Sequence, residues 1–99
     1  MSHAWEKFYE GARILAGEGA QRKRLIDAFT HCISGLRKEE FPSALQNEFE
    51  DLMVDVTREE AVGEEGTIQA TIMKLSDVEI SETIDRVLSL FSDLARLKR

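Results

Sequence analysis

Few residues in this 99-residue chain have both the type and the spacing that catalysis or metal binding requires. The nearest case is Asp27 with His31, a carboxylate and an imidazole four positions apart. On a helix this spacing brings the two side chains together, as an ion pair or as two ligands of a metal ion. A transition-metal site needs three or four ligands, and the sequence has no Glu-x-x-His or His-x-x-x-His motif to supply the others. We therefore expect neither a metal site nor a cofactor.

Cys32 follows His31 directly, which raises the question of a thiol nucleophile with an imidazole base. Adjacent residues on a helix point about 100° apart, so these two side chains would not meet well. Cys32 instead falls beside the apolar positions Phe29 and Leu36, which indicates a small buried thiol. The chain also lacks a glycine-rich phosphate loop and a Gly-x-Ser-x-Gly elbow. These observations predict a protein that is not an enzyme.

Basic residues form two short clusters, Arg22, Lys23 and Arg24 at an expected helix start and Arg37 with Lys38 further on. At 100° per residue, the first three side chains spread over about 200°. A phosphate-binding helix would instead repeat its basic residues every three or four positions. The formal net charge of −6 also repels a phosphate backbone. We favour neutralisation of these charges within the fold, and keep a nucleic-acid-associated regulator as the alternative function.

Acidic residues dominate the second half of the chain, and Glu48, Asp51 and Asp55 share one helical face. Such a face suits a hard cation or a basic partner. It lacks the closely spaced, glycine-turned ligands of a calcium loop, so a solvated surface is the simpler interpretation.

The spacing of apolar residues by three and four predicts helices throughout. We expect helices over residues 4–16 and 20–36, a third that follows Pro42 and fades near Glu60, and helical structure over 67–97. The expected apolar stripes are Trp5, Phe8, Ala12 and Leu15 in the first helix, Leu25, Ile26, Phe29, Ile33 and Leu36 in the second, and Phe41, Leu45, Phe49, Leu52 and Val56 in the third. No segment sustains the alternation that a strand needs.

Three patterns resemble helix caps. Ser43 with Gln46 and Ser76 with Glu79 each match a capping box, and Thr67 is a further N-cap candidate. The predicted fold is an all-α, compact bundle of four short helices, or five if Ser76 starts a new one. At this length, we expect residues 1–99 to form a single helical domain without a linker or second domain.

The expected carboxyl-terminal helix is unusually apolar. Its predicted core stripe is Ile80, Ile84, Leu88 and Phe91, and four further residues widen the apolar face to nearly half the circumference: Val87, Leu90, Leu94 and Leu97. A surface helix usually shows a narrower face, on the order of 100–140°. One interpretation is that this helix is central and covered from two sides. The interpretation favoured here is that the four residues form an interaction surface for a second copy or for a partner protein helix.

These features together predict a small acidic interaction or regulatory protein that is not an enzyme and that self-associates as a homodimer through its carboxyl-terminal helix. No apolar run approaches the ~20 residues that cross a bilayer, so we expect no membrane partner. The segment MSHAWEKFYE lacks the order of a secretory signal, and one cysteine provides no internal disulfide. We therefore expect a cytoplasmic location. Neither the partner's identity nor a ligand follows from the sequence.

Overall fold

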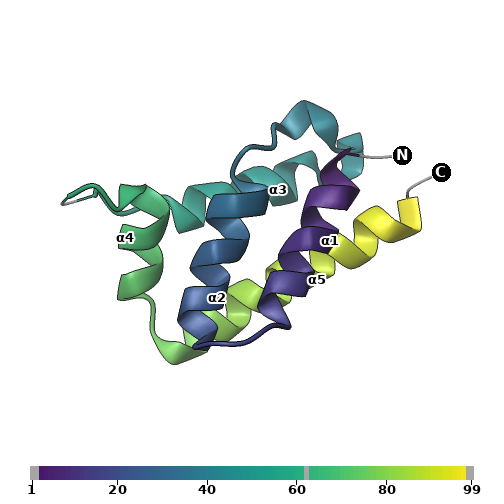
Figure 1. The fold of residues 1–99 in the computed structure, drawn as a ribbon. Helices are drawn as coiled ribbons and strands as arrows, with labels where there is room; N and C mark the ends of the chain where they lie inside the picture. The colour runs from purple at the N-terminus through teal and green to yellow at the C-terminus, as the bar shows by residue number, and fades with distance from the viewer. Residues whose placement is uncertain (1–2, 62, 98–99) are drawn as a thin grey trace.

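The chain folds into five α-helices and two short helical turns in the computed structural model, which describes residues 3–61 and 63–97 (Figure 1). In chain order the elements are α1 (His3–Leu15), α2 (Gln21–Ala28), the π-helical turn η1 (Phe29–Ile33), the 3-10 turn η2 (Lys38–Glu40), α3 (Ser43–Val56), α4 (Gly66–Lys74) and α5 (Asp77–Leu97). No strand occurs in these described ranges. The predicted all-α bundle is confirmed, with the five helices that a break at Ser76 implies.

The longest helix, α5, runs through the bundle and contacts α1, α2 and α3. α2 also packs against α1, while α4 lies at one end of the molecule against α2 and α3 (Figure 1). The beginning of α1 and the end of α5 lie at the other end of the molecule, so these two helices run in roughly opposite directions (Figure 1).

The core forms where the apolar stripes of these helices meet. The expected stripes of the second and third segments are buried as predicted: Leu25, Ile26, Phe29, Ile33 and Leu36, and Phe41, Leu45, Phe49, Leu52 and Val56. In α1, Phe8 and Leu15 are buried together with Ala4, whereas Trp5 is only partly covered. Phe41 stacks on Phe49 with 4.2 Å between ring centroids and meets Phe8 edge-on at 5.9 Å. This aromatic contact joins α1 to α3.

α5 turns a different stripe to the core from the expected one. Val87 and Leu90 are fully buried and Leu94 is almost so, together with Ile80 and Thr83. The prediction that Val87, Leu90 and Leu94 form an exposed interaction surface is therefore wrong, because α1 and α3 both pack on α5 and enclose this stripe. Of those four residues only Leu97 is exposed.

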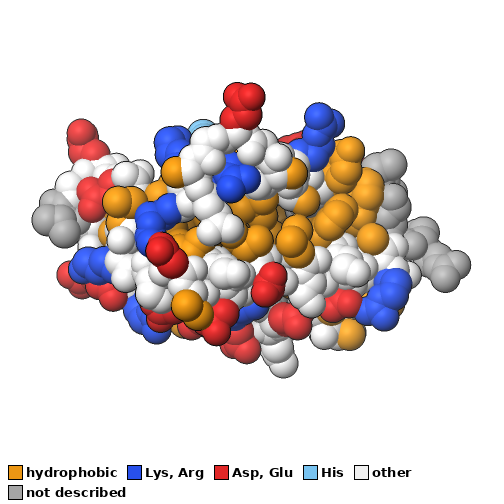
Figure 2. Space-filling model, turned by 90° about the horizontal axis from the view of Figure 1, so that it is seen from below, with side chains coloured by type: hydrophobic (Ala, Val, Ile, Leu, Met, Phe, Trp, Pro, Cys, Tyr) orange, Lys and Arg blue, Asp and Glu red, His pale blue; other side chains and the backbone are white. Residues whose placement is uncertain are grey.

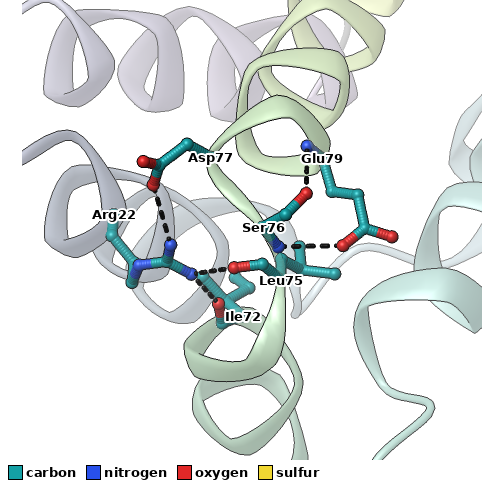
Figure 3. A network of polar contacts seen from close by, with 6 residues as sticks. All are labelled: Arg22, Ile72, Leu75, Ser76, Asp77 and Glu79. Carbon is teal, nitrogen blue, oxygen red and sulfur yellow. Dashed lines mark hydrogen bonds and ion pairs between the residues drawn. The ribbon is translucent and has the colours of Figure 1, made fainter.

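The joint between α4 and α5 is held by main-chain and side-chain hydrogen bonds (Figure 3). The Ser76 N–H donates to Glu79 Oε1 at 2.8 Å, and the Glu79 N–H donates to Ser76 Oγ at 3.1 Å. These reciprocal bonds are a capping box, as the sequence predicts, and they start α5. Arg22 reaches across from α2 to the end of α4, where its guanidinium donates to the carbonyl oxygens of Ile72 and Leu75, each at 2.6 Å.

Two expected helix boundaries are wrong. The second helix stops at Ala28 and continues as the π-turn η1, in which the Ser34 N–H donates to the Phe29 carbonyl oxygen. Thr30 lies in this turn, and its hydroxyl donates a hydrogen bond to the carbonyl oxygen of Ile26. This side-chain bond competes with the main-chain hydrogen bond that a regular α-helix would make there. The third helix ends at Val56 rather than near Glu60.

Two of the expected caps do not form. Ser43 already lies inside α3, whose N-cap is Pro42, and the Gln46 side chain donates instead to the Phe41 carbonyl oxygen. Thr67 likewise lies inside α4, which begins one residue earlier. That first residue, Gly66, has φ +82°, a conformation that favours glycine.

No described helix is both long and apolar enough to cross a membrane.

Candidate interaction surface

Three aromatic side chains from α1 and α5 form a cluster at the surface. Trp5 and Tyr9, one turn apart on α1, stack with ring centroids 5.4 Å apart and planes 9° apart. Phe91 of α5 lies against both, with centroid distances of 6.0 Å to Trp5 and 6.1 Å to Tyr9. Aromatic pairs at these separations attract each other, so the cluster fixes α1 on α5. It also leaves Tyr9 43% exposed to solvent.

The apolar surface continues along α5 from this cluster. Leu88, one turn before Phe91, is 41% exposed, and Ile84, one turn earlier still, is partly buried. Figure 2 shows hydrophobic side chains gathered in a band on the lower side of the molecule, toward the end where α1 begins and α5 ends. We call the surface made by Trp5, Tyr9, Ile84, Leu88 and Phe91 the α1–α5 face.

Most of this face does not follow from the apolar spacing in the sequence. The spacing places Leu88 and Phe91 in the core and Trp5 on the buried stripe of its helix, and it does not single out Tyr9. A signal did exist, because Tyr9 stands one turn after Trp5 at the edge of the apolar stripe. Leu97 does not extend the face: it stands nine positions after Leu88, which places it about 180° around α5.

The two arginines of the first basic cluster, Arg22 and Arg24, make hydrogen bonds within the fold. Arg22 donates to the end of α4 and pairs with Asp77 at 3.2 Å. Arg24 donates to the carbonyl oxygens of Leu15 at 2.6 Å and Gly17 at 3.2 Å, which lie at and just beyond the end of α1. Two arginines of α2 thus supply hydrogen bonds at the carboxyl ends of two other helices, α1 and α4, where carbonyl groups lack their full set of helical partners.

The remaining basic residues of the two clusters lie on the surface. Lys23 pairs with Asp27 at 2.9 Å, one turn along α2. Lys38 pairs with Glu50 at 3.6 Å, and Arg37 is exposed. The cationic side chains therefore point to several separate partners, and this arrangement weakens the case for one phosphate-binding surface.

Asp27 and His31 come close, with 3.9 Å between Asp27 Oδ1 and His31 Nε2. Both line an open groove of about 530 Å³ between α2 and α4, together with Lys23 and Met73. Asp27 already pairs with Lys23, so its charge is neutralised on the groove wall. Among the described residues, no group of three or more His, Cys, Asp and Glu side chains converges as metal ligands would.

Cys32 is buried, 7% exposed, as the sequence indicates. Burial raises the pKa of its thiol, and the negative charge of Glu10 raises it further, while Lys7 opposes this effect. A raised pKa keeps the thiol protonated at neutral pH, the opposite of what an activated nucleophile needs. Cys32 therefore acts here as a small apolar side chain.

The expected acidic face is divided in two. Glu48 and Asp51 are exposed on α3, whereas Asp55 pairs with Arg86 of α5 at 2.7 Å. Asp55 therefore helps to join α3 to α5, and only the other two carboxylates remain as solvated surface.

Comparison with protein-family models, with curated proteins and with solved structures gave no match to this chain.

Proposed function

We propose that this protein is a small interaction module without catalytic activity that binds another protein through the α1–α5 face. The observation that carries this proposal is the aromatic cluster of Trp5, Tyr9 and Phe91, which continues into the exposed Leu88. Aromatic side chains are enriched at the centres of protein interfaces, where they bury a large area at a small cost in conformational entropy. Exposed apolar patches on small proteins commonly mark such sites.

The exposed apolar residues outside the α1–α5 face do not form a second surface of this kind. Val54, Met73, Val78 and Leu97 are more exposed than Tyr9. Val54 and Met73 lie on α3 and α4, and Val78 and Leu97 lie near opposite ends of α5. Single apolar residues are normal on a protein surface. The α1–α5 face differs from them because its five side chains are contiguous and come from two helices.

Site-specific photocrosslinking in the cells that express the protein tests this function. A benzophenone amino acid is placed at Tyr9, at Leu88 and, as a matched control, at Val54, which is 66% exposed on α3. We expect protein adducts from positions 9 and 88 and none from position 54. Adducts from none of the three positions, or equal yields from all of them, would contradict the proposed docking face.

A further inference from the structure

We propose that the α1–α5 face binds a second copy of this chain, face to face, about a two-fold axis that lies in the plane of the face. This inference rests on the function proposed above and adds the identity of the partner. It is carried by four charged residues at the edges of the face: Glu6, Arg13, Asp85 and Arg96.

The charged residues stand on the outer edges of the two helices, and all four are exposed. Glu6 and Arg13 are seven positions apart, about two turns, and lie within about 60° of Tyr9 around α1. Asp85 and Arg96 are eleven positions apart, about three turns, and lie within about 80° of Leu88 around α5. Each helix therefore carries one acid and one base beside the apolar face, at different heights.

The opposite directions of α1 and α5 then set the order of the charges. Phe91 contacts Trp5 and Tyr9, so the end of α5 lies beside the beginning of α1 (Figure 1). Glu6 consequently shares one end of the face with Arg96, and Arg13 shares the other end with Asp85. We call these four positions the corners of the face. In order around its edge they are Glu6, Arg96, Asp85 and Arg13, and their charges alternate between negative and positive.

An alternating pattern of this kind is complementary to itself. A two-fold axis parallel to the helices places Glu6 opposite Arg96 of the copy and Arg13 opposite Asp85 of the copy. An axis across the helices places Glu6 opposite Arg13 and Asp85 opposite Arg96. Either axis brings unlike charges together at all four corners. A heterologous partner would have to supply the matching pattern by itself, whereas a second copy carries it already.

Most of these charges are unused within the subunit. Across the described chain, no ion pair or side-chain hydrogen bond involves Glu6, Arg13 or Asp85, while Arg96 pairs with Asp93. Other charged side chains do find partners, such as Arg86 with Asp55. The corner charges are thus available for contacts between subunits, where they would set orientation while the aromatic centre supplies most of the affinity.

Sedimentation equilibrium of the purified full chain at micromolar concentrations tests the partner. We expect a monomer–dimer equilibrium, and Leu88→Glu should raise the dissociation constant at least tenfold, which is about 1.4 kcal/mol. Val54→Glu is the matched control and should leave the dimer unchanged. Leu88 is exposed enough for the new carboxylate to reach water, and circular dichroism checks that each variant folds.

Charge reversal tests the pairing without touching the apolar centre. Arg13→Glu should weaken the dimer by about threefold to tenfold, or about 0.7–1.4 kcal/mol, because a two-fold dimer loses two exposed pairs that each contribute a few tenths of a kcal/mol or more. Adding Asp85→Arg restores the dimer if the axis is parallel to the helices, and adding Glu6→Arg restores it if the axis crosses them. If neither second change restores the dimer, the corner pairing is wrong.

The outcomes separate this inference from the proposed function. A purified chain that stays monomeric, together with crosslinks from positions 9 and 88 to a different protein, overturns the second copy as partner and leaves the docking face in place. A monomer without such crosslinks overturns both.

Discussion

The Arg22 guanidinium donates a 2.6 Å hydrogen bond to the main-chain carbonyl oxygen of Leu75, 53 positions further along the chain. Leu75 caps α4, where the last carbonyl groups lack the N–H partners that a continuing helix would supply, although the Leu75 N–H itself donates to the Ile72 carbonyl oxygen at 3.2 Å. The same nitrogen also donates to the Ile72 carbonyl oxygen, and the second guanidinium nitrogen pairs with Asp77 (Figure 3). A side chain of α2 thus fixes both the end of α4 and the beginning of α5.

Replacement of Arg22 by Ala should therefore destabilise the protein. Two partly buried carbonyl groups lose their charged donor, at a cost of about 1–3 kcal/mol in the free energy of unfolding. Urea unfolding followed by circular dichroism measures this change. Lys23→Ala is the matched control from the same basic cluster, because Lys23 makes only an exposed pair with Asp27 and should change stability by no more than about 0.5 kcal/mol. Equal losses for the two variants would show that Arg22 has no special role in the fold.

Ser76 should contribute measurably more than Ser43 to the free energy of unfolding. Ser76→Ala removes the oxygen that accepts the Glu79 N–H, and loss of such a cap costs about 0.5–2 kcal/mol. Ser43 makes no cap bond, so Ser43→Ala should be close to neutral. Thermal unfolding of the two variants side by side checks the difference, and the prediction fails if Ser43→Ala is the more damaging.

These two serines also show where sequence reasoning succeeds and where it stops. Both precede a Glu or Gln by three positions, and the pattern alone does not tell them apart. At Ser76 the helix begins one residue later, so the hydroxyl can reach the Glu79 N–H. At Ser43 the preceding Pro42 takes the cap position, and the serine is drawn into the first turn. A shift of one residue in the start of a helix decides the outcome, and the capping-box spacing does not specify this start.

The capping carboxylate of Glu79 should make stability depend on pH in the acid range. Its pKa is lowered, first by the hydrogen bond from the Ser76 main-chain N–H and then by the Ser76 side chain. A carboxyl group with a lowered folded-state pKa stabilises the fold at neutral pH, and this contribution disappears as the pH falls below the ordinary range near ~4.3. Glu79→Gln should thus be less stable than the native chain at neutral pH, and the difference should shrink on acidification. A difference that grows on acidification would contradict this sign.

Within α5, substitution of Leu90 and of Leu88 by alanine should change the free energy of unfolding by different amounts, because Leu90 lies in the core and Leu88 on the α1–α5 face. Leu90 is fully buried, so Leu90→Ala should cost about 2–5 kcal/mol in the free energy of unfolding. Leu88 is 41% exposed, so much of its surface is already in contact with water. Leu88→Ala should therefore lower the free energy of unfolding by less than half as much as Leu90→Ala. Urea unfolding at submicromolar concentration keeps any dimer from contributing to the comparison.

The same pair explains why the candidate face could not be assigned from the sequence. α5 is apolar over nearly half its circumference, so the pattern permits two stripes, and both contain leucines at helical spacing. Which of the two stripes is buried depends on where α1 and α3 contact α5. The local spacing of apolar residues does not indicate these long-range contacts. The stripes of the second and third segments were predictable because each is narrow and spans no more than about 100° of its helix.

The buried thiol of Cys32 should react slowly with an alkylating reagent at neutral pH. Burial and the nearby Glu10 carboxylate raise its pKa, so little reactive thiolate is present in the folded chain. Iodoacetamide labelling followed by mass spectrometry should therefore proceed much faster in urea than in buffer. Glu10→Gln removes the negative charge that raises the pKa and also frees Lys7, which pairs with Glu10 at 3.4 Å and lowers the pKa. The labelling rate of this variant in buffer should consequently rise, and an unchanged rate would show that access alone, without the electrostatic contribution, controls the reactivity of Cys32.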